Sequence, residues 1–152
     1  VLKRSYQSEI SRFHPDNFAS KSEPEKLQAL QNTSLLNSAY SALKTPLSRA
    51  TYLLKLEGMD AFDEKDTAME EGFLLSQIEL RDELEAIEEN KNNLGLDDFI
   101  ERIDSFIEEK IESISEAYNL SSDQQLIKRH VRELKFFDQL YKEANALMDE
   151  WF

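Results

Sequence analysis

The chain has 152 residues, of which 40% are hydrophobic and 32% charged, a composition typical of one or two folded domains. Three glycines and three prolines are too few for the turns of an all-β fold, and the lack of cysteine excludes a disulfide framework, a cysteine nucleophile and a thiolate metal site. The formal net charge of −13 disfavours binding to nucleic acid or to an anionic membrane.

Charge is distributed unevenly along the chain. Residues 1–57 carry eight basic and five acidic side chains, whereas the remainder carries ten basic and 26 acidic ones. This asymmetry predicts two modules with different partners. No apolar run approaches the roughly 18 residues of a membrane span and no secretory signal is present, so we expect an intracellular protein.

The first predicted element is an amphipathic helix. Apolar residues recur on one face at spacings of 4, 4 and 3 residues: Leu2, Tyr6, Ile10 and Phe13. Pro15 ends this helix, because proline disfavours helical backbone at the residue before it. Helical periodicity already runs at Val1, so we expect the natural chain to begin earlier.

A loop over residues 16–22 and a second, longer helix are predicted next. Ser22 and Glu25 have the spacing of a capping box, which favours a helix start at this point. Apolar periodicity then continues to about Lys44.

A short helix is predicted after that, with Thr45 as its N-cap and Pro46 in its first turn. Gly58 fits its C-terminal end. The acidic stretch that follows is predicted to be a linker, which divides the chain into a first domain at 1–58, a linker at 59–68 and a second domain at 69–152.

The second domain is predicted to contain three long helices, at about 69–91, 97–119 and 122–150. Gly95 and Asp97 mark the first break, and Asn119 with a capping box from Ser121 to Gln124 marks the second. Short loops between long helices predict an antiparallel three-helix bundle, so the expected fold class is all-α.

Two helices of this bundle carry apolar residues on more than one side. In the first helix, Phe73, Leu80, Leu84 and Ile87 form a core stripe, and Leu74, Leu75 and Ile78 lie elsewhere. In the last helix, Ile127, Val131, Leu134, Tyr141 and Met148 form the stripe; Phe136 lies nearly opposite, with Leu140 and Leu147 beside it. Extra core packing and an exposed interaction patch both remain open, and we favour exposure for Leu75, Ile78 and Phe136.

The two histidines differ in setting. His130 lies within a helix without a second histidine nearby, which favours a structural role at the bundle edge. His14 stands between a helix end and Pro15, followed by Asp16, so a stiff turn displays an imidazole and a carboxylate. A plain helix stop with polar loop residues is the alternative.

The His14-Pro15-Asp16 tripeptide, after a basic amphipathic helix and before a long one, resembles the J-domain family of DnaJ-like co-chaperones. Residues 10–19 (ISRFHPDNFA) and 37–56 (NSAYSALKTPLSRATYLLKL) are similar to its HscB/Jac-type branch. The resemblance covers essentially the whole helical plan. The family's short first helix has no counterpart here, so we expect a J-domain that is incomplete at its N-terminus.

The resemblance implies a non-enzymatic adaptor that needs neither cofactor nor metal. It implies that the first domain docks on a DnaK-type, HscA-like chaperone and stimulates its ATPase. The residues implied in this docking are His14, Pro15, Asp16, Lys3, Arg4 and Arg12.

The resemblance also implies that the second domain binds an IscU-type scaffold of iron–sulfur cluster assembly. The implied face comprises Leu74, Leu75, Ile78, Glu79, Asp82 and Phe136. Large apolar side chains ringed by acids suit a partner with an apolar pocket and a basic rim. We expect a monomer in the bacterial cytoplasm, or in the mitochondrial matrix if the protein is eukaryotic.

Two alternatives remain at this stage. One is a helical adaptor with a degenerate J-domain and a different protein partner. The other is a metal-dependent hydrolase that uses His14, Asp16 and further acids, which the two distant histidines and the lack of a glycine-rich phosphate loop disfavour.

Overall fold

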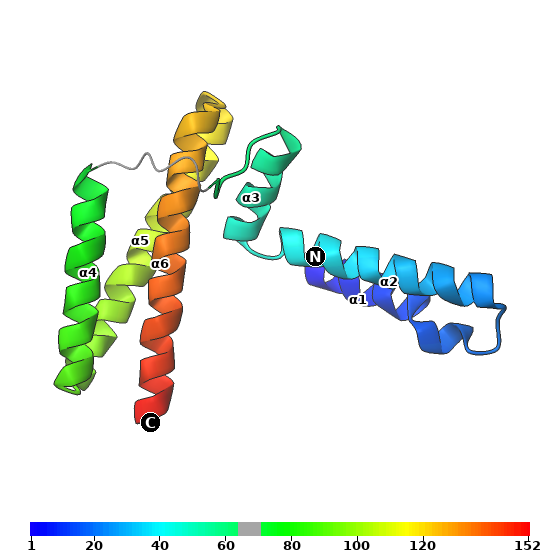
Figure 1. Ribbon diagram of the computed structural model, residues 1–152, viewed down its shortest axis with the longest axis horizontal. Coiled ribbons are helices and arrows are strands. Elements are labelled where there is room, and N and C mark those ends of the chain that lie inside the picture. The colour runs from blue at the N-terminus through cyan, green and yellow to red at the C-terminus, as the bar shows by residue number, and fades with distance from the viewer. Residues whose placement is uncertain (64–70) are drawn as a thin grey trace. The chain divides into compact units, whose positions relative to one another are not determined.

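The computed structural model describes residues 1–63 and 71–152, and the regular elements in these ranges are all helices (Figure 1). This confirms the predicted all-α class. The chain divides into two compact units, Val1–Leu53 and Leu54–Phe152. The predicted linker at 59–68 extends into residues that lie outside the described ranges, so the domain limits stay a prediction.

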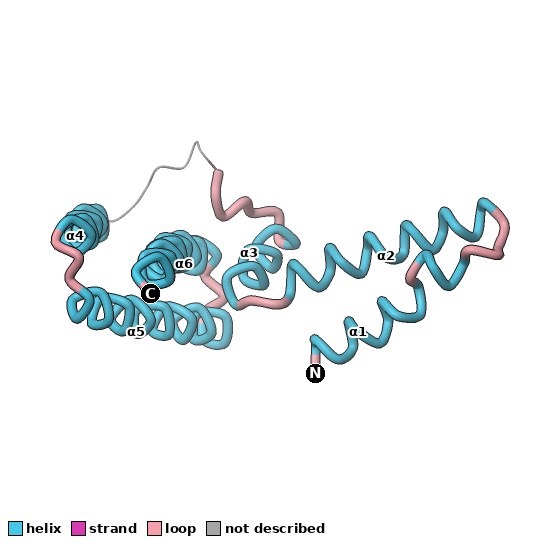
Figure 2. The backbone as a smooth tube through the Cα atoms, turned by 90° about the horizontal axis from the view of Figure 1, so that it is seen from below, coloured by secondary structure: helices cyan, strands magenta, loops and turns pink. Residues whose placement is uncertain are grey.

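The first unit is built on a helical hairpin. Helix α1 (Leu2–Phe13) is followed by the single-turn 3-10 helix η1 (Pro15–Phe18) and by α2 (Glu23–Leu43), and Figure 2 shows the turn that joins them. The predicted cap is confirmed, because Ser22 Oγ accepts a hydrogen bond of 3.4 Å from the Glu25 amide. The predicted loop at 16–22 is partly helical, because η1 extends into it.

Aromatic stacking joins the two helices of the hairpin. The rings of Tyr6 and Tyr40 are nearly parallel with centroids 4.2 Å apart, and the Tyr6 hydroxyl donates a hydrogen bond to Asn37 Oδ1. Ala29 is buried on α2. The apolar face of α1 is only half-buried, so this hairpin relies on stacking and polar contacts as much as on burial.

Helix α3 (Pro46–Leu56) begins and ends as predicted. Thr45 Oγ1 accepts a hydrogen bond of 3.1 Å from the Ser48 amide and so caps the first turn. At the other end, Gly58 has φ +84°, a left-handed conformation that favours glycine, and the Met59 amide donates to the Leu54 carbonyl at 2.9 Å.

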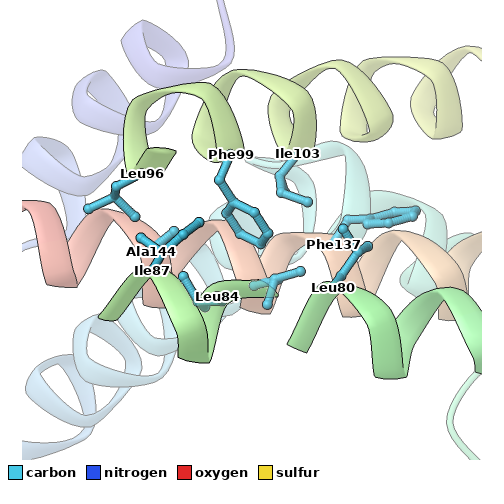
Figure 3. Packing of buried hydrophobic residues seen from close by; sticks show 9 residues of the cluster. Leu80, Leu84, Ile87, Leu96, Phe99, Ile103, Phe137 and Ala144 are labelled. Atoms are coloured by element: carbon cyan, nitrogen blue, oxygen red, sulfur yellow. The ribbon is translucent and has the colours of Figure 1, made fainter. Parts of the chain in front are cut away.

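The second unit contains the predicted antiparallel bundle of α4 (Glu71–Glu89), α5 (Asn93–Leu120) and α6 (Gln124–Trp151). Short connections make consecutive helices antiparallel, as the ribbon shows (Figure 1). Their inward faces meet in one apolar cluster, drawn in Figure 3: Leu80, Leu84, Ile87, Leu96, Phe99, Ile103, Phe137, Leu140 and Ala144.

The prediction for the α4 stripe is confirmed, whereas the α6 stripe is broader than predicted. Leu80, Leu84 and Ile87 are buried, with Phe73 packed against the cluster. Leu140, predicted to lie beside Phe136 and away from the stripe, is completely buried. Helix α6 contacts both α4 and α5, so it buries a wider arc than one facing stripe.

Two predicted breaks between helices are displaced. Helix α5 begins four residues earlier than expected, because Asn92 caps it by accepting a hydrogen bond of 3.0 Å from the Gly95 amide. A Cβ at Gly95 would lie 2.5 Å from Asn92 Nδ2, so glycine leaves room for the capping side chain. Asp123, and not Ser121, caps α6, and Asn119 lies inside α5.

Candidate binding surfaces

The turn between α1 and η1 places His14 and Asp16 in solvent. His14 has extended backbone (φ −59°, ψ 133°), as a residue before proline favours, and its Nδ1 accepts a hydrogen bond of 3.2 Å from the Asp16 amide. The two side chains are 53% and 91% exposed. The imidazole thus caps η1 and remains accessible to a partner.

The hydrogen bond at Nδ1 determines what the imidazole offers. Since Nδ1 accepts the amide hydrogen of Asp16, the neutral ring carries its proton on Nε2. The Asp16 carboxylate provides acceptor oxygens on the other side of the ring, with Oδ2 3.4 Å from His14 Nδ1. A partner therefore meets one N–H donor and one carboxylate on the same turn.

Two residues that sequence reasoning missed bind the last turn of α1, one from η1 and one from α2. Asn17 Nδ2 donates a hydrogen bond of 2.6 Å to the Ser11 carbonyl, and Thr33 Oγ1 donates one of 2.9 Å to the Phe13 carbonyl. Both satisfy carbonyls that the end of a helix leaves without an intrahelical partner. A polar threonine on the inward face of α2 is the sequence signal that could have indicated the second bond.

The three basic residues predicted for chaperone docking all lie exposed on α1. Lys3 and Arg4 are near its start, and Arg12 is near its end, about 14 Å further along the helix. Arg12 pairs with Glu9 at 3.3 Å and lies 5.4 Å from the centroid of the Phe13 ring. At about 100° per residue these cations spread over about half of the helix circumference and do not form one narrow stripe.

The outward face of α4 carries the apolar patch predicted from its periodicity. Leu74, Leu75 and Ile78 are 44%, 57% and 58% exposed, so the expectation of exposure is confirmed for Leu75 and Ile78. Glu79 and Asp82 are exposed one turn further along the helix. The patch and its acidic neighbours thus form a continuous surface.

Phe136 lies at the edge of the bundle core and is half-buried, so the expectation of a free, exposed ring is only partly met. Its ring makes edge contacts with Phe73 and Phe137, with centroids 5.8 and 5.6 Å away. Its helix packs on two neighbours, so a residue nearly opposite the α6 stripe still contacts the core.

Acidic residues continue the outward face of α4 towards its C-terminus. Glu85 and Glu89 are exposed, as is Ala86 between them. At about 100° per residue, Glu85 and Glu89 fall within the arc between Leu74 and Leu75, which also holds Ile78 and Asp82. The surface therefore changes from apolar to acidic along the helix.

A partly buried polar cluster lies between α5 and α6. Glu133 is buried and pairs with Lys110, and His130 Nδ1 lies 3.7 Å from Glu133 Oε2. Burial lowers the pKa of His130, with the positive charge of Lys110 as the next cause. His130 thus lies partly buried beside the Lys110–Glu133 pair. Within residues 1–63 and 71–152, no group of three potential ligands could hold a metal ion.

Within the part of the chain that the structure describes, no helix is both long enough and apolar enough to cross a membrane.

Comparison with known proteins covers both units. Residues 69–145 match the family model of the HSCB C-terminal oligomerisation domain. The solved structure of chaperone HscB from Vibrio cholerae is similar over 99% of this chain and 88% of its own, with 31% identity and a TM-score of 0.87. The crystal structure of human co-chaperone protein HscB is similar over 95% and 71%, with 26% identity and a TM-score of 0.86.

Proposed function

The chain belongs to the HscB family of J-domain co-chaperones, and on this premise we propose that it stimulates the ATPase of a DnaK-type, HscA-like chaperone. In the same proposal it delivers an IscU-type scaffold to that chaperone during iron–sulfur cluster assembly and transfer. The observation that carries the proposal is the presence, in one chain, of an accessible His14–Asp16 turn and of a separate exposed apolar face on α4. Each surface suits a different partner.

The chaperone-binding surface comprises the turn and the basic residues of α1, namely His14, Pro15, Asp16, Lys3, Arg4 and Arg12. The imidazole Nε2–H and the Asp16 carboxylate give directional contacts, and the cations steer an acidic chaperone surface towards the turn. Stimulation then follows from tighter binding to the hydrolysis-competent chaperone conformation, which shifts the population towards it. No proton transfer by this chain is needed.

The scaffold-binding surface comprises Leu74, Leu75, Ile78, Glu79, Asp82 and Phe136. Exposed leucine and isoleucine side chains lose contact with water when they enter an apolar pocket, and this provides affinity. The carboxylates beside them favour basic groups at the pocket's rim, which provides register and a faster encounter.

Carrying both surfaces on one chain makes the second binding event intramolecular. The scaffold then meets the chaperone at an effective concentration that free diffusion does not reach. Bacterial and human proteins are among the similar structures, and we propose the bacterial cytoplasm, or the mitochondrial matrix in a eukaryote, as the place of action.

The proposal is tested by separating the two activities. His14→Gln should abolish stimulation of the chaperone ATPase, because it alters the turn's donor and cap, while scaffold affinity by calorimetry stays unchanged. The double variant Leu75→Ala, Ile78→Ala should do the reverse and lower scaffold affinity by about 2 kcal/mol or more, as truncation of interface hot spots does.

Leu94→Ala is the matched control for the second variant, because Leu94 is 79% exposed on α5, away from the α4 face. Full stimulation by the His14 variant would exclude the chaperone-docking role of the turn. Equal affinity of the control and the α4 double variant would exclude the scaffold-binding role of that face.

A further inference from the structure

We infer that Arg81 is a positioning residue that holds the Phe136 ring at the edge of the α4 face, an inference that deepens the proposed scaffold-binding role and rests on it. Arg81 lies on α4, three residues after Ile78, where side chains are neighbours on a helix surface. Phe136 lies on α6, so the apolar patch of α4 and this ring belong to different helices.

The guanidinium group of Arg81 contacts two groups of α6 at once. Its Cζ is 5.6 Å from the centroid of the Phe136 ring, and its Nη1 pairs with Glu143 Oε2. The ion pair restricts the long arginine side chain, and the cation then lies over the aromatic ring. Arg81 therefore joins α4 to the ring itself.

The Phe136 ring needs such a contact because the core covers it only in part. Phe73 and Phe137 meet it edge to face, but the ring is half-buried and remains open to solvent elsewhere. A half-exposed phenylalanine gains rotamer freedom when a neighbouring side chain is removed. Binding would then have to restrict that freedom again, which lowers affinity.

The Arg81–Glu143 pair also affects the charge that a partner meets. The cation is paired within the unit, whereas Glu79, Asp82 and Glu85 are exposed on the same helix. The face thus keeps its acidic character although an arginine lies within it.

A similar contact on another side of the bundle provides a matched control. Arg102 of α5 pairs with Glu83 of α4 and lies 5.7 Å from the Phe99 ring centroid, so it repeats both contacts of Arg81. Phe99, however, is completely buried in the core. Loss of Arg102 removes a similar link between helices without freeing a ring at the binding face.

The experiment compares Arg81→Ala, Arg81→Lys and Arg102→Ala for affinity to an IscU-type scaffold, each with and without Phe136→Ala. Arg81→Ala should weaken binding about threefold, and Arg81→Lys should restore most of the loss, as a cation–aromatic contact at an exposed site predicts. In the Phe136→Ala background the effect of Arg81→Ala should disappear, since the arginine acts through the ring. Arg102→Ala should bind like the parent chain.

A second measurement uses the free protein. Side-chain coupling constants by NMR should show one χ1 rotamer of Phe136 in the parent chain and averaging in Arg81→Ala. An unchanged single rotamer in Arg81→Ala, or an equal loss of affinity in Arg102→Ala, would overturn the inference. If Phe136→Ala alone leaves affinity unchanged, the proposed role of this ring in scaffold binding falls, and the rotamer measurement still decides whether Arg81 holds it.

Discussion

Among the described side chains of Val1–Leu53, the buried hydrophobic residues are Ala29 and Ala50, whereas Leu54–Phe152 buries a continuous cluster that includes Phe99, Ile103 and Leu140. The first unit holds its turn with individual hydrogen bonds and one aromatic stack. The second holds a helix face with a packed core. The conformation of the turn is therefore sensitive to the loss of single polar groups. The fold of the bundle, by contrast, tolerates changes to the exposed residues of its helix face.

The largest expected effect is on the stability of the bundle. Phe99→Ala should lower the free energy of unfolding of the second unit by about 4 kcal/mol, because it removes a buried ring and leaves a cavity. Amide hydrogen exchange should show the loss of protection in α4, α5 and α6, with α1 and α2 unaffected. A loss below about 1 kcal/mol, the usual effect of a surface change, would contradict a core centred on this ring.

Helical periodicity was sufficient to predict most of the second unit, because burial there follows the face of each helix. It placed Leu80, Leu84 and Ile87 correctly. It misplaced Leu140, since periodicity does not say how many neighbours a helix has. The predicted start of α5 was also wrong, because either Asn92 or the later Asp97 could cap a helix.

The candidate sites were predictable to different degrees, because helical periodicity describes a single helix and not the contacts between helices. The exposed leucines of α4 followed from their position on the helix. The bond from Thr33 to the Phe13 carbonyl joins residues 20 positions apart, and no local pattern predicts which carbonyl a threonine will reach. The cap that the His14 side chain makes by accepting from the Asp16 amide depends on a rotamer that only the folded turn selects.

An intermediate effect is expected for the first unit. Thr33→Val keeps the shape of the side chain but removes its hydroxyl, so the Phe13 carbonyl loses its bond, at a cost of about 1 kcal/mol to the hairpin. Amide exchange at Asp16 and Asn17 should become faster. Thr51→Val is the matched control, because Thr51 bonds only to the Leu47 carbonyl of its own helix. Equal exchange rates in both variants would show that the turn does not depend on this bond.

The smallest expected effect is the pH dependence that His130 gives to the bundle. Burial, and then Lys110, lowers the pKa of this histidine in the folded state, so below about pH 6.5 the unfolded chain binds more protons than the folded one. Stability contributed by the neutral ring is present above that pH and is lost as the pH falls towards the folded pKa. His130→Gln should therefore flatten the decline of unfolding free energy between pH 7 and pH 5. At pH 8 the ring is neutral in both states, so any difference between variant and parent there measures packing alone. An undiminished decline in the variant would assign the pH dependence to the carboxylates of the bundle.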